Sequence, residues 1–162
     1  MRRLAAALLW LPAVAAAEEG AGSGEEARAH AGAHAHVHHA AVFLGAATSS
    51  HETAPAAGVD YLYALPWLDH RLGVGPLVEA AFGSRTELTA GLALGIRGPV
   101  GLQLALAPIL VLVESDREWG GRLNLSYGYP LGETFSIGPS VSADLLPHQT
   151  LYVYGLSAGA GF

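Results

Sequence analysis

The sequence contains no cysteine and no lysine, and each absence narrows what the chain can do. Without cysteine it forms no disulfide and carries no lipid on an amino-terminal thiol. Every cation is an arginine, and 8 basic residues stand against 14 acidic ones, for a formal net charge of −6. An acidic chain without basic clusters is a poor candidate for nucleic acid binding. We therefore expect no nucleic acid partner.

Long apolar runs are also missing, although 51% of the residues are apolar. The longest run, from Val100 to Val113, is interrupted by Gln103 and Pro108. A membrane-spanning helix needs roughly 18 or more consecutive apolar residues. High apolar content without such a run is typical of a membrane β-barrel, whose strands alternate between apolar and polar residues.

The amino-terminal segment, residues 1–17, has the three parts of a secretory signal peptide. It begins with Arg2 and Arg3, continues with a short apolar run and ends on Ala15 and Ala17. Cleavage there removes two arginines and no acid, which leaves 6 arginines against 14 acidic residues, a net charge of −8. Residues 18–37 follow as a leader rich in Ala, Gly, Glu and His, which we expect to be disordered because it cannot form a core.

From residue 38 to residue 162 the pattern changes to short strand-like runs separated by turn residues, as in a sandwich or a barrel. An even number of strands puts both ends of this region on one side, as in single-chain bacterial barrels. The charged segment Glu114–Glu118 and the segment Ser49–Pro55 are predicted to be loops. The eight predicted strands cover residues 38–47, 57–65, 71–82, 86–96, 100–113, 119–129, 134–145 and 150–162.

The two faces of these strands differ in chemistry. One face carries mostly leucine, valine, isoleucine and tyrosine, and the other carries most of the charged and amide side chains. Apolar outside and polar inside is the reverse of a soluble lipocalin-like barrel, so we predict that the apolar face contacts lipid. The polar face is predicted to fill the interior as a plug of ion pairs and hydrogen bonds or, alternatively, to line a narrow pore. These interior residues are Asp60, Glu79, Glu87, Arg97, Gln103, Arg122, Asn124 and Asp144.

A short motif recurs along the chain, with a proline between a small and a variable residue. Pro76, Pro108 and Pro139 lie 32 and 31 residues apart, the length of one two-strand unit. A proline removes a donor from the sheet, so a closed barrel tolerates it only at a bulge or a kink. The repeat therefore predicts a bulge at three equivalent places in the wall.

The last predicted strand, Thr150–Phe162, alternates apolar and small residues and ends the chain on an aromatic residue. It resembles the closing strand of bacterial outer-membrane barrels of the small OmpA/OmpX-like class. The resemblance implies an all-β fold, an eight-stranded antiparallel up-and-down transmembrane β-barrel. It also implies export to the outer membrane of a Gram-negative bacterium, with Phe162 as part of the signal read by the barrel-assembly machinery. The expected surroundings of such a barrel are outer-membrane lipid and lipopolysaccharide, with the barrel as a monomer.

A non-enzymatic structural or surface-interaction barrel is the expected function, and two other functions are considered beside it. A deacylase of this class that acts on lipid A would carry Ser, His and an acid on the outer wall, but Ser140, Ser142 and Ser157 fall on the inner face. An acyltransferase would need a hollow apolar interior, whereas the predicted interior is polar. No enzyme and no resident cofactor are therefore expected. The histidines of the leader are spaced so that they could converge on a divalent metal, or they could be ordinary residues of a polar linker. These histidines are His30, His34, His36, His38 and His39.

Overall fold

The computed structural model describes residues 37–50, 52–66, 70–98 and 101–162. The predicted signal peptide, nearly all of the leader, and His30, His34 and His36 lie outside the described residues. None of the described residues forms a helix long and apolar enough to cross a membrane.

Nine strands account for most of the described chain. The bounds are β1 His38–Thr48, β2 Thr53–Ala64, β3 Leu72–Phe82, β4 Thr86–Arg97, β5 Leu102–Val113, β6 Asp116–Tyr127, β7 Tyr129–Leu131, β8 Phe135–Leu145 and β9 Thr150–Gly161.

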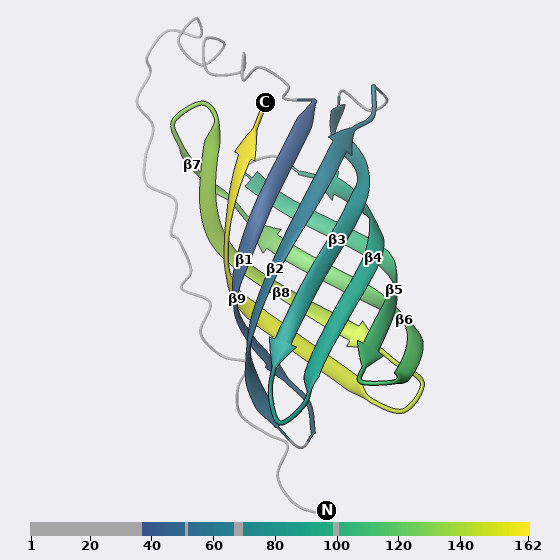
Figure 1. Ribbon diagram of the computed structural model, residues 1–162. Coiled ribbons are helices and arrows are strands. Elements are labelled where there is room, and N and C mark those ends of the chain that lie inside the picture. Colours follow the sequence, from purple (N-terminus) through teal and green to yellow (C-terminus); the bar gives the residue numbers. More distant parts are fainter. Residues whose placement is uncertain (1–36, 51, 67–69, 99–100) are drawn as a thin grey trace, which may run out of the picture. The chain divides into compact units, whose positions relative to one another are not determined.

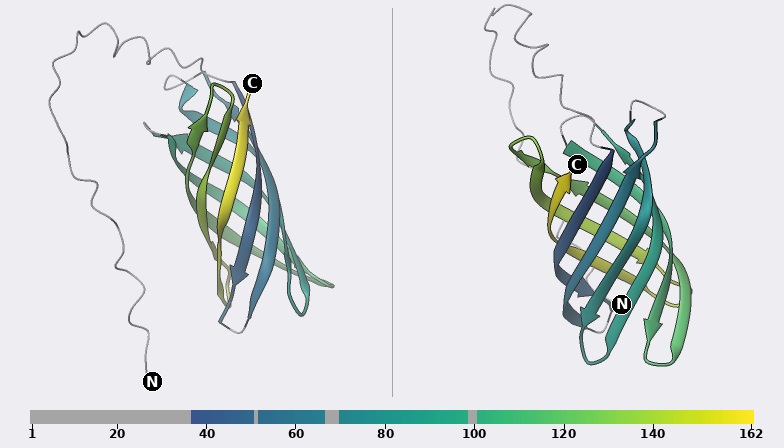
Figure 2. Two further views of the ribbon diagram at one scale, coloured as in Figure 1. Left: turned by 90° about the vertical axis from the view of Figure 1, so that its left-hand side faces the viewer. Right: turned by 45° about the horizontal axis from the view of Figure 1, so that its top comes forward.

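All strand pairs are antiparallel, and each strand except β6 pairs with the next one along the chain. The short β7 follows β6 after Gly128, and both pair with β8, so the two occupy one strand position in the wall. Pairing of β1 with β9 closes the sheet (Figure 1). The strands are tilted and wrap around a continuous wall (Figure 2). The predicted eight-stranded antiparallel up-and-down barrel is confirmed.

The seam between β1 and β9 brings the two ends of the barrel sequence together. The amide of His38 donates to the carbonyl of Phe162 at 3.0 Å, and the amide of Phe162 donates back to the carbonyl of His38 at 2.9 Å. We call this end of the barrel the terminal end, and the opposite end, with the turns after β1, β3, β5 and β8, the far end. The hydrogen bonds extend the seam to the last residue of the chain.

The wall carries large apolar side chains on its outside. Leu44 is 67% exposed, and Phe162 is 63% exposed, whereas Ile109 on the inner face is fully buried. A soluble monomer seldom exposes a contiguous apolar patch larger than a few hundred Å². The predicted assignment of the apolar face to the outside is confirmed, including the terminal strand, whose even-numbered residues face out.

The interior is not polar throughout, and in this respect the prediction was wrong. Two apolar clusters lie inside, one around Phe43 and Val153 and the other around Leu62 and Ile109. The second cluster includes residues of β5, which is apolar on both faces. A strand without alternation does not reveal from its sequence which of its residues face inward.

The turns at the far end are shorter than expected. The predicted charged loop Glu114–Glu118 is instead a tight turn at Glu114 and Ser115, and β6 already begins at Asp116. β2 begins at Thr53, so Pro55 lies within the strand. Pro55 is tolerated there because the pairing of β2 with β3 starts only at Ala56, and no ladder donor is needed on that side.

The three repeated prolines interrupt the wall at equivalent places. Each is paired with one neighbouring strand and skipped by the other. Pro76 is skipped by β2, Pro108 by β4, and Pro139 by the β6–β7 strand position. The interruption at Pro108 lies beside an apolar hollow of about 470 Å³ on the outer wall. Leu92 and Leu106 are among the residues that line this hollow. The interruptions recur at the predicted places, but they are not the predicted bulges, because each skips two residues on both strands and leaves the register unchanged.

Candidate functional site in the barrel interior

The most heavily charged part of the interior is centred on Arg122 of β6. Arg122 pairs in register with Asp144 of β8, so both side chains point inward from adjacent strands. The Nε atom of Arg122 donates to Asp144 Oδ1 at 2.6 Å, and its Nη2 donates to Asp144 Oδ2 at 2.7 Å. This is the two-pronged geometry in which a planar guanidinium matches a carboxylate.

The same guanidinium also reaches Glu79 on β3. Its Nη1 donates to Glu79 Oε2 at 3.0 Å, and its Nη2 donates to Glu79 Oε1 at 2.9 Å. β3 is not a neighbour of β6 in the sheet, so this contact crosses the lumen. We call Glu79, Arg122 and Asp144 the interior triad; its members are 7%, 6% and 0% exposed.

The interior triad can hold the barrel together across its width, because its three buried charges compensate one another and come from three different strands. A buried ion pair is costly to assemble, but removing one partner leaves an uncompensated charge in a poorly solvated place. Two apolar clusters also lie inside the barrel. A barrel of eight strands has an interior that side chains can fill completely.

The remaining predicted interior residues do not belong to the interior triad. Asn124 of β6 donates to Ser140 at 3.0 Å and to Ser142 at 2.9 Å, both on β8. Asp60 and Glu87 face inward from β2 and β4, and no hydrogen bond or ion pair within the described part of the chain links either to the interior triad. The last two predicted residues, Arg97 and Gln103, line a small cavity at the terminal end together with His39.

The structure does not bring His38 and His39 together. They are consecutive residues of β1, so their side chains lie on opposite faces of the wall. The described residues contain no group of three His, Asp or Glu side chains placed to hold a metal ion. Whether the other leader histidines bind metal stays a prediction.

On the outer face, His38 joins an aromatic cluster that sequence reasoning missed. Its ring stacks on Phe162, with ring centres 5.4 Å apart and planes 13° apart, and it contacts the rings of Tyr61 and Tyr63. His38 Nδ1 is also hydrogen-bonded to the hydroxyl of Tyr61. This cluster ties β2, β1 and the chain terminus together at the terminal end. Alternation could have revealed it, because His38 of β1 and Tyr63 of β2 both occupy outward-facing positions and are paired in register.

At the far end, two contacts join neighbouring turns. Glu52, in the turn after β1, accepts hydrogen bonds from the backbone amide and the hydroxyl of Ser84 in the next turn, both at 2.6 Å. Arg85 lies 3.7 Å from Glu114, and both side chains are exposed. An exposed pair of this kind contributes little stability, so the Glu52–Ser84 contact is the more specific link.

Lowering the pH is expected to release the Glu52–Ser84 contact. The two hydrogen bonds from Ser84 hold the pKa of the Glu52 carboxyl below its usual value. The contact is therefore fully present above the usual pKa of a glutamate, about 4.3, and is lost as the pH falls through the lowered value. The amide signal of Ser84, followed by NMR against pH, should titrate with a midpoint below about 4.3. Glu52→Gln should abolish this titration, and a midpoint at or above the usual value would contradict the assignment.

Comparison with known proteins places the fold. No known protein-family model and no curated protein matches the sequence. The solved structures include similar ones at low identity. The chain is similar to Ail, the attachment invasion locus protein of Yersinia pestis, with a TM-score of 0.53, 13% identity, and coverage of 77% of this chain and 96% of that one.

Two other solved barrels are similar to the same extent. One is the N-terminal β-barrel domain of OprF from Pseudomonas aeruginosa, with a TM-score of 0.52, 16% identity, and coverage of 76% of this chain and 97% of that one. The other is Neisserial surface protein A, with a TM-score of 0.52, 12% identity, and coverage of 77% and 96%. The fold is that of the small eight-stranded outer-membrane barrels, and the resemblance seen in the sequence is confirmed.

Proposed function

We propose that the protein is a non-enzymatic, integral barrel of the bacterial outer membrane with a structural or surface-interaction role in the cell envelope. The observation that carries this proposal is the distribution of side chains across the wall. Large apolar residues such as Leu44 and Leu106 cover the outside, while buried charges and apolar clusters fill the inside. An apolar outer surface of this kind is stable in the hydrocarbon core of a lipid bilayer.

The terminal end is the periplasmic one under this proposal, as in single-chain bacterial barrels with both ends on that side. The exposed Phe162 is then available to the barrel-assembly machinery before its ring stacks on His38. The far-end turns, residues 49–52, 83–85, 114–115 and 146–149, face the outside of the cell, where lipopolysaccharide and other surface molecules are in reach. Their shortness favours contact close to the membrane surface.

Reconstituted protein is expected to insert into lipid and to show no conductance steps in planar bilayers. We expect this because the interior triad crosses the lumen and two apolar clusters lie inside the barrel, which leaves ions without a continuous water path. Incorporation is checked by heat-modifiable gel mobility of the same vesicles, and a conducting porin serves as the positive control. Reproducible steps from the inserted barrel would favour the narrow-pore alternative, and failure to fractionate with outer membranes would contradict the proposed location.

A further inference from the structure

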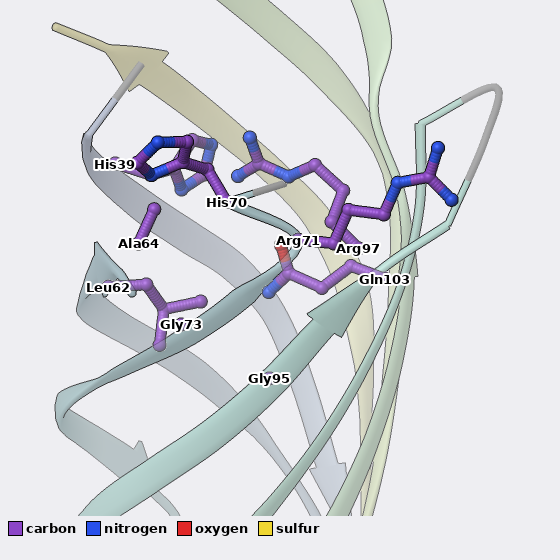
Figure 3. A pocket seen from close by; sticks show the side chains of 9 residues that line it. All are labelled: His39, Leu62, Ala64, His70, Arg71, Gly73, Gly95, Arg97 and Gln103. Atoms are coloured by element: carbon purple, nitrogen blue, oxygen red, sulfur yellow. The ribbon is translucent and has the colours of Figure 1, made fainter. Parts of the chain in front are cut away.

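A small cavity at the terminal end of the barrel gathers positively charged and donor side chains. It is separate from the interior triad and has a volume of about 20 Å³, enough for a single water-sized occupant. His39 of β1, His70 and Arg71 of the turn before β3, Arg97 of β4 and Gln103 of β5 line it, along with Leu62, Ala64 and two glycines. Figure 3 shows the amide of Gln103 extending toward the histidine side of the cavity.

None of the described residues that line this cavity carries a carboxylate. In a protein with more acidic than basic residues, that distribution is unexpected. Arg122 and Arg85 both have acidic partners, whereas no ion pair engages Arg71 or Arg97 within the part of the chain that the structure describes. The half-buried Arg97 therefore points a permanent charge inward without a described counter-charge.

The strand register makes this arrangement more costly. The amide of Arg97 donates to the carbonyl of Arg71 at 2.8 Å, and the next residues along, Leu72 and Ile96, are paired. Arg71 and Arg97 are thus directly opposite each other on adjacent strands. Two like charges in that position repel, and the exposure of Arg71 to solvent keeps this repulsion weak.

His70 adds a second, independent sign of a missing occupant. Its Nδ1 atom is buried and has no hydrogen-bond partner within the described part of the chain. A buried polar atom without a partner is costly, so such atoms are normally satisfied by protein, water or a ligand. An anion in the cavity would accept from His70, Gln103 and Arg97 and would offset the repulsion between the arginines.

We propose that this cavity is a binding site for one small anion of halide size, entering from the terminal end. The size of the cavity selects a compact ion, and the donors around it select negative charge. Anion binding at this site depends neither on the proposed envelope role nor on whether the barrel conducts ions.

The probe is bromide, applied to the full-length protein in detergent micelles and in crystals. The unfolding midpoint is measured against sodium bromide at constant ionic strength, with sodium isethionate, whose anion is too large for the cavity, as the balancing salt. We expect a saturable rise in the midpoint, and an anomalous-scattering peak within hydrogen-bond distance of Arg97 and His70. A midpoint that depends only on ionic strength, or a crystal without that peak, would overturn the proposal.

Arg97→Gln removes one charge-assisted contact and should lower the bromide affinity about tenfold or more. Because it also removes the repulsion with Arg71, the variant should unfold no earlier than the parent when bromide is absent. Arg117→Gln, an exposed arginine at the other end of the barrel, is the matched control and should bind bromide like the parent. Equal bromide affinity of Arg97→Gln and the parent would refute the site.

Asp69 lies outside the described residues but is next to His70 in the sequence, so Asp69→Asn completes the set. If the cavity takes an external anion, the bromide affinity of this variant stays within about threefold of the parent's. A change of that size corresponds to less than half of the free energy of a hydrogen bond to a charged group. A tightening of tenfold or more would show that the chain's own carboxylate neutralises the cavity, and that result would also overturn the proposal.

Discussion

Replacing Arg122 with methionine is expected to destabilise the barrel by about 3–5 kcal/mol. The substitution keeps the unbranched apolar stem of the side chain but removes the guanidinium, which leaves Glu79 and Asp144 without a cation. Asp144 is fully buried, so its charge can be neither solvated nor matched. The free energy of unfolding is measured by urea titration of the barrel in lipid vesicles, with tryptophan fluorescence and gel mobility as readouts.

The matched control is Arg117→Met, which removes an exposed arginine from the same strand. It should change the free energy of unfolding by no more than about 0.5 kcal/mol. A second test combines Arg122→Met with Glu79→Gln and Asp144→Asn. Because the unpaired charges are then gone, the triple variant should recover much of the lost stability. If Arg122→Met alone unfolds like the parent, the interior triad does not brace the barrel.

The second large effect is expected at the glycines that precede two of the repeated prolines. A Cβ atom added at Gly138 would lie 1.8 Å from the carbonyl oxygen of Tyr127, and one at Gly75 would lie 1.9 Å from that of Tyr61. Both contacts are with backbone of the neighbouring strand, which cannot turn aside as a side chain could. Alanine at either position should cost about 3 kcal/mol or more, at the upper end of overpacking effects.

Gly121→Ala is the control for these two substitutions, since a Cβ atom there would meet nothing within 4 Å. It should change stability by no more than about 0.5 kcal/mol. The readout is the fraction of protein that keeps the faster, folded gel mobility after refolding into vesicles. Folding of Gly75→Ala and Gly138→Ala as complete as that of Gly121→Ala would show that the strands do not approach as closely as the structure has them.

Much of the fold was predictable because a barrel strand repeats every two residues. That period identified the outer face of the terminal strand and of most of the others, and the spacing of Pro76, Pro108 and Pro139 located the interruptions of the wall. It failed on β5, where both faces are apolar, and at the far-end turns, where charged residues such as Asp116 continue the strand. Charge alone does not end a strand at the edge of a membrane barrel, because the strand extends into solvent.

The candidate site was predictable only in part. Alternation placed Glu79, Arg122 and Asp144 on the inner face, but it could not say which carboxylates one guanidinium would join. The partner of Arg122 on the adjacent strand follows from register, while Glu79 is reached across the lumen. That contact depends on how far the strands are staggered around the closed wall, which no single strand encodes.

The sequence by itself determined that the chain alternates like a lipid-facing barrel, that it has an even number of strand positions and that it ends on an outward-facing Phe162. These properties follow from the local pattern of the chain, since alternation depends on residues two positions apart and the strand count only repeats that pattern. Only the tertiary structure decided that Arg122 bridges β3, β6 and β8, that His38 stacks on Phe162 while His39 lies inside, and that Arg71 opposes Arg97. Those contacts join residues far apart in the chain, and their distances are set by the register between strands and by the closure of the barrel.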